Sequence, residues 1–114
     1  MTAERNPPVR GYAKPVVVPD RLDLLAGPTS GVVHLPRHLK WSGSARYDLD
    51  QPGRIADLYR TVLNEAATTA DICGHLDQAT LMRLWPSLWL PMPVRRAWED
   101  RFPQLAELRH SPAA

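Results

Sequence analysis

His34 and His38 are four residues apart, the spacing at which two metal ligands meet on one face of a helix. Pro36 lies between them and argues against a helix, because proline interrupts the helical hydrogen-bond pattern. In an extended strand the two side chains would lie roughly 13 Å apart, too far to share a metal ion. We therefore expect no metal site here and interpret both histidines as surface or partner-facing residues.

Cys73 and His75 are the residue types of a nucleophilic pair, since a histidine can activate a neighbouring thiol. Such a pair also needs a third group that orients the histidine, and a lone cysteine on an apolar helix face is more typical of a core. The sequence contains no phosphate-binding glycine loop, zinc-protease motif or nucleophile elbow. We expect a protein that is not an enzyme and that uses no cofactor.

Tryptophan, proline and arginine gather between Leu76 and Leu105, where three of the four tryptophans lie. Prolines divide this stretch into short pieces, so its rigid aromatic side chains should define a fixed apolar surface edged by arginines. Such a surface either completes a small core or docks onto a partner, and the sequence leaves both open. For the second case we predict five partner-binding residues: Trp89, Arg95, Arg96, Trp98 and Arg101.

A second segment, residues 32–43, invites the same two interpretations. Its sequence, VVHLPRHLKWSG, begins with residues that favour extended structure and contains a proline that limits strand pairing. It could be an exposed edge onto which another chain adds a strand, or the β-part of the domain's own core.

The charge balance bears on nucleic-acid binding. The chain has 14 basic and 12 acidic residues and no block of like charge, whereas DNA-binding proteins usually carry a basic stripe. The alternative function is nevertheless a small DNA-binding transcriptional regulator that uses the helix expected at 77–85 or at 93–102. Its motivation is a set of four arginines: Arg83, Arg95, Arg96 and Arg101.

The elements that position these side chains are expected to be short. The clearest helix is 52–66, with an apolar residue every three or four positions, Asp50 as its N-cap and Pro52 in its first turn. Further helices are expected at 20–26, from Thr69, after Asp77 and after Pro93, and a hairpin should pair 31–36 with 45–49. The predicted fold class is mainly α with a small β-hairpin element (α+β), its short helices separated by prolines.

The domain organisation follows from composition. We predict a flexible N-terminal arm over 1–19, a single globular domain over 20–109 and a loose tail over 110–114. No stretch has the roughly 20 apolar residues of a membrane span or the apolar run of a signal peptide. We expect a cytoplasmic protein that does not bind membranes.

The stretch from Gly27 to Leu105 resembles a group of small proteins of high-GC bacteria that are labelled uncharacterised or transcriptional regulators. The resemblance rests on GPTSGVVHLPRHLKWSG, YDLD, LYRTVLNEA and LWPSLWLPMPVRRAWEDRFPQL. It implies an antitoxin-like role, with a nucleotidyltransferase-type toxin as the cognate partner, and assigns no catalytic residue. The resulting prediction is a non-catalytic protein-interaction module, an antitoxin that binds and neutralises its toxin.

Overall fold

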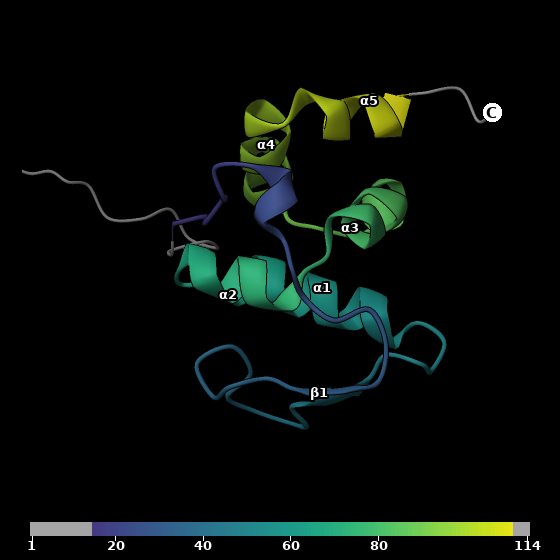
Figure 1. Ribbon diagram of the computed structural model, residues 1–114. Helices are drawn as coiled ribbons and strands as arrows, with labels where there is room; N and C mark the ends of the chain where they lie inside the picture. Colours follow the sequence, from purple (N-terminus) through teal and green to yellow (C-terminus); the bar gives the residue numbers. More distant parts are fainter. Residues whose placement is uncertain (1–14, 111–114) are drawn as a thin grey trace, which may run out of the picture.

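The computed structural model describes residues 15–110 and confirms a mainly α fold with one small antiparallel sheet (Figure 1). The hairpin lies at one end of the molecule, α1 and α2 lie over it, and α4 and α5 form the opposite end. The elements in chain order are η1 (Leu22–Leu24), β1 (Val32–His34), β2 (Arg46–Asp48), α1 (Arg54–Glu65), α2 (Thr69–His75), α3 (Gln78–Leu84), η2 (Trp85–Ser87), α4 (Met92–Arg101) and α5 (Pro103–His110).

The predicted hairpin is present, with Val33 opposite Tyr47 at its centre. β1 ends at His34, before Pro36, as the missing N–H of proline requires. Tyr47 is only 2% exposed, and the guanidinium of Arg54 lies 4.5 Å from the centre of its ring. A two-stranded sheet is marginal alone, so these contacts with the start of α1 help to stabilise it.

The predicted long helix corresponds to α1, but its expected cap was wrong. The residue before the helix is Gly53, whose φ of 78° suits glycine, and the Asp50 carboxylate instead accepts a hydrogen bond from the Gly31 amide at 3.3 Å. The apolar stripe is confirmed, because the buried residues of α1 are Leu58, Tyr59, Val62 and Leu63.

Two predicted helix starts are confirmed by side-chain caps. Thr68 accepts a hydrogen bond from the Asp71 amide while the Asp71 carboxylate accepts from the Thr68 amide, a reciprocal capping box at the start of α2. Asp77 caps α3 by accepting from the Thr80 amide at 3.0 Å. By contrast, the helix expected at 20–26 is only the single turn of η1, with no side-chain cap.

A close backbone crossing joins the N-terminal segment to α2. The Ala26 amide donates to the Cys73 carbonyl and the Gly27 amide to the Leu76 carbonyl, both at 2.8 Å. A Cβ atom on Gly27 would lie 2.2 Å from the carbonyl carbon of His75. Only glycine permits so close an approach, so the backbone of α2 determines the residue type at position 27.

The C-terminal part holds the aromatic core. The ring centres of Trp85 and Trp98 are 6.2 Å apart, and those of Trp98 and Phe102 are 6.0 Å apart. The last predicted helix corresponds to α4. A further helix, α5, was not predicted, and it buries Leu105 completely.

The structure moves the predicted domain boundaries. Of the expected arm, residues 1–14 lie outside the described residues, but Val16, Val17 and Val18 pack against the core and Pro19 is fully buried. The packed part therefore begins before residue 20. Of the expected tail, His110 belongs to α5 and residues 111–114 lie outside the description. Within residues 15–110, no helix has the length and apolar character needed to cross a membrane.

Candidate functional site

The five predicted partner-binding residues do not form one surface. Trp98 is completely buried and Arg95 is 9% exposed, so these two belong to the core. Trp89 is 78% exposed, and Arg96 and Arg101 are also on the surface. Trp85 and Trp98 therefore belong to the core, whereas Trp89 lies on the surface.

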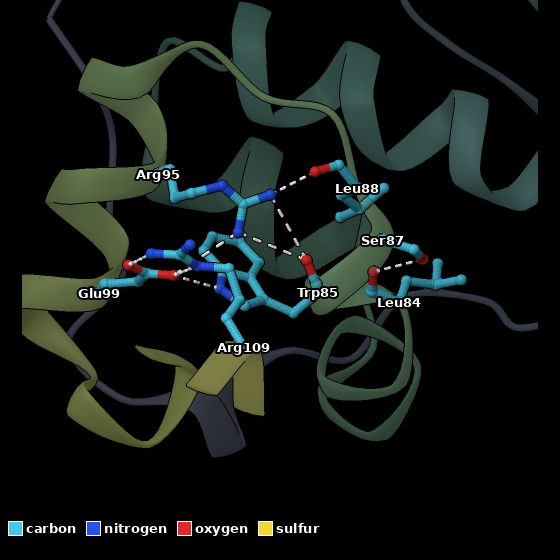
Figure 2. Close-up of polar contacts among 7 residues, drawn as sticks. All are labelled: Leu84, Trp85, Ser87, Leu88, Arg95, Glu99 and Arg109. Atoms are coloured by element: carbon cyan, nitrogen blue, oxygen red, sulfur yellow. Dashed lines mark hydrogen bonds and ion pairs between the residues drawn. The ribbon is translucent and has the colours of Figure 1, made fainter. Parts of the chain in front are cut away.

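Arg95 points inward, and its guanidinium holds the segment that precedes α4 (Figure 2). Its guanidinium donates to the carbonyl of Leu88 and, at 3.5 Å, to the carbonyl of Trp85, and it lies 4.9 Å from the centre of the Trp85 ring. Burial, together with the nearby charge of Arg109, lowers the pKa of Arg95. Arg95 thus uses its donors inside the fold and is removed from the predicted basic surface.

Glu99 is the counter-charge of this cluster. Its carboxylate accepts from Arg109 at 2.6 and 2.7 Å and from the indole N–H of Trp85 at 2.9 Å, and it lies 3.6 Å from Arg95. The hydrogen bonds from Arg109 lower the pKa of Glu99 to about 2, against the opposing effect of burial, and the bond from Trp85 adds to the lowering. The cluster joins η2, α4 and α5, so its evident role is structural.

The arginines suggested for DNA binding are also dispersed. Arg101 pairs with Asp20 at 3.1 Å, Arg95 is buried, and Arg83 and Arg96 are exposed. The helices 77–85 and 93–102 therefore do not present the four guanidinium groups together.

The two exposed tryptophans, Trp41 and Trp89, line one groove of about 390 Å³. Its other walls are residues 39–42 around Trp41 and Arg60, Thr61, Asn64 and Glu65 of α1. We call it the Trp41–Trp89 groove. It is the candidate functional site, because it combines large exposed aromatic surfaces with nearby polar groups in a concave place.

Local structure explains why Trp89 faces outward. It lies in an extended segment between Leu88 and Leu90, which are 4% and 9% exposed. Alternate residues of an extended chain point in opposite directions, so burial of both leucines leaves the indole on the surface.

The loop that carries Trp41 is held at three points. The amides of Leu39 and Lys40 donate to the carbonyl of Pro36 at 2.9 and 3.1 Å, and the Leu39 side chain is buried. His38 contributes the third contact, a 2.9 Å bond between its Nε2 and the Asp71 carboxylate. Trp41 was not among the predicted site residues, and the signal for it was its place near the end of the 32–43 segment.

The histidines and the cysteine weighed above for metal binding or nucleophilic catalysis do not line the groove. The region from residue 15 to 110 contains no group of three or more His, Cys, Asp or Glu residues placed to hold a metal ion. The ring Nδ1 of His75 bonds to the Asp71 carbonyl oxygen at 2.8 Å, and Cys73 is half-buried against the core.

Comparisons of the chain with protein-family models, curated protein sequences and solved structures found no match.

Proposed function

We propose that this protein is a non-catalytic protein-interaction module and that its partner binds in the Trp41–Trp89 groove. The observation that supports this most is the exposure of the two indoles, 77% for Trp41 and 78% for Trp89, at one concave site. Tryptophan is enriched among the residues that dominate binding energy, because it covers a large apolar area at small entropic cost.

The contacts that anchor both tryptophan-bearing segments also support binding. Trp89 is held between two buried leucines and Trp41 follows a loop tied to α2, so little ordering of the backbone would accompany association. The resemblance described above suggests a toxin as the cognate partner, with the protein acting as its antitoxin. In this proposal the antitoxin neutralises the toxin by occupying a surface that the toxin needs.

The test is co-purification of a tagged protein from its native host at moderate salt, followed by titration of the co-eluting partner with purified variants. Trp41→Ala and Trp89→Ala should each weaken the complex by at least about tenfold, as expected for central aromatic contacts. Leu24→Ala is the matched control, because Leu24 is a 41% exposed apolar residue outside the groove. Retention of the partner by both tryptophan variants, or absence of any partner protein, would contradict the proposal.

A further inference from the structure

We infer that the groove selects an acidic peptide: an extended, proline-containing segment of the partner whose apolar residues pack against Trp41 and Trp89 and whose carboxylate pairs with Lys40. This inference rests on the function proposed above and adds the chemical class of the partner. It follows from the charges of the groove, the position of Lys40 and the two exposed indoles that line the groove.

The charged side chains that line the groove differ in whether they already have an interaction partner. Arg60 forms an ion pair with Asp57, which also accepts a 2.9 Å bond from Arg54. Glu65 already has an interaction partner. Of the two cations that line the groove, Lys40 is the one without a carboxylate within ion-pair distance among the described residues.

Lys40 is placed to use its charge. It is half-buried, its amide is bound to the Pro36 carbonyl, and its side chain lies beside Gly43, where an added Cβ would be 3.8 Å from Cε. Gly43 has a φ of 73°, so the turn that follows Trp41 favours glycine. A lysine whose stem packs on a loop keeps its ammonium at the groove wall with less rotamer freedom to lose on binding.

The two exposed indoles of the groove favour an extended, proline-containing chain. Aromatic grooves recognise extended proline-containing segments well, because proline presents a flat apolar ring and the polyproline conformation costs little entropy to fix.

Single-stranded nucleic acid is the competing ligand, since bases also stack on tryptophan. It needs a positively charged groove that follows its phosphates. Here Arg60 is paired with Asp57, and the carboxylate of Glu65 also lines the groove. These charges favour a peptide with few acidic residues over a polyanion.

The test follows the four indole N–H signals by NMR while peptides are added to the full chain. The probe is a capped nonapeptide, Gly-Ser-Pro-Pro-Leu-Asp-Pro-Ser-Gly, compared with versions that carry Asn or Lys in place of Asp. The Asp peptide should shift the signals of Trp41 and Trp89 and leave those of the buried Trp85 and Trp98 unmoved. It should bind about two- to fivefold more tightly than the Asn peptide, the range of a partly exposed ion pair.

Charge reversal at Lys40 is the decisive variant. Lys40→Glu should favour the Lys peptide over the Asp peptide, and Lys40→Gln should remove the discrimination. Arg37→Glu is a control on the same loop, because Arg37 is exposed and does not line the groove. Equal binding of the three peptides, no indole shift with any of them, or a larger shift with a ten-residue oligothymidine would overturn the inference.

The failure of this inference is distinguishable from failure of the proposed function. If the purified partner is lost by Trp89→Ala but is bound equally well by Lys40→Glu, the groove is still the docking site and the acidic-peptide inference is wrong. If both tryptophan variants retain the partner, the docking site itself is wrong.

Discussion

The indole N–H of Trp85 donates to the carboxylate of Glu99 at 2.9 Å, and this bond joins the turn after α3 to the C-terminal half of α4. Trp85 is fully buried, so its N–H needs an acceptor inside the protein. The same carboxylate receives Arg109 from α5 (Figure 2). One acidic side chain therefore holds three C-terminal elements together.

Trp85→Phe should destabilise the protein more than Trp98→Phe. Both tryptophans are fully buried and lose the same atoms, but the Trp98 N–H has no hydrogen-bond partner in the described structure, whereas Trp85 bonds to a carboxylate. The difference should be about 1.5–3 kcal/mol, the net value of a hydrogen bond to a charged group. Urea denaturation of the two variants measures it, and equal losses would show that the Trp85–Glu99 bond adds nothing to stability.

Acid should destabilise the fold through Glu99. The folded-state pKa of about 2 lies below the ordinary value of 4.5, so the stabilisation is complete above pH 4.5 and is lost as the pH falls towards 2. The loss should be on the order of 3 kcal/mol, because each pKa unit corresponds to about 1.4 kcal/mol. Denaturant unfolding across this pH range would measure it.

Glu99→Gln is the comparison for the acid experiment, since it cannot titrate. Hydrogen bonds from Ala67, Thr68 and His38 also lower the pKa of Asp71, against the effect of its burial, so Asp71 contributes acid sensitivity in both proteins. The difference between wild type and Glu99→Gln isolates Glu99. A difference that stays constant from neutral pH to pH 2 would refute this assignment.

How much the sequence predicted depends on whether a feature was local. The apolar stripe of α1 and the helix starts at Thr69 and after Asp77 depend on neighbouring residues, and these helices were found at the expected places. The burial of Arg95 depends on carbonyls seven and ten residues earlier, and no local pattern reports that distance. For this reason Arg95 and Trp98 were assigned to a surface from which the fold removes them.

The candidate site shows the same limit. Trp89 was predicted as a partner-binding residue because it lies in the stretch rich in tryptophan, proline and arginine. Its alternation with buried Leu88 and Leu90 explains why it is exposed. Trp41 comes from a segment almost fifty residues earlier, and only the packing of loop 39–42 beside α1 brings it to the same groove. Sequence reasoning thus found one of the two exposed tryptophans of the groove, but not its pairing with the other.

Gly27→Ala and Gly74→Ala should have opposite effects. A Cβ on Gly27 would lie 2.2 Å from backbone of α2, so the crossing must open and the Gly27–Leu76 hydrogen bond must be lost. Nothing lies within 4 Å of a Cβ on Gly74, which is inside α2. Gly27→Ala should cost more than about 2 kcal/mol by overpacking, and Gly74→Ala should gain roughly 0.5–1 kcal/mol from helix propensity. Thermal unfolding of the pair tests both, and a stable Gly27→Ala protein would show that the crossing can relax.

The four tryptophans should divide into two stability classes when each is truncated to alanine. Trp98→Ala removes a fully buried ring and should cost about 3–5 kcal/mol. Trp41→Ala and Trp89→Ala remove rings that are more than three-quarters exposed, so each should change stability by no more than about 0.5 kcal/mol. The measurement is urea denaturation followed by circular dichroism, which does not rely on tryptophan as its probe. A loss above 2 kcal/mol for either groove variant would place that indole in the core and would remove the basis for using it as a binding-site probe.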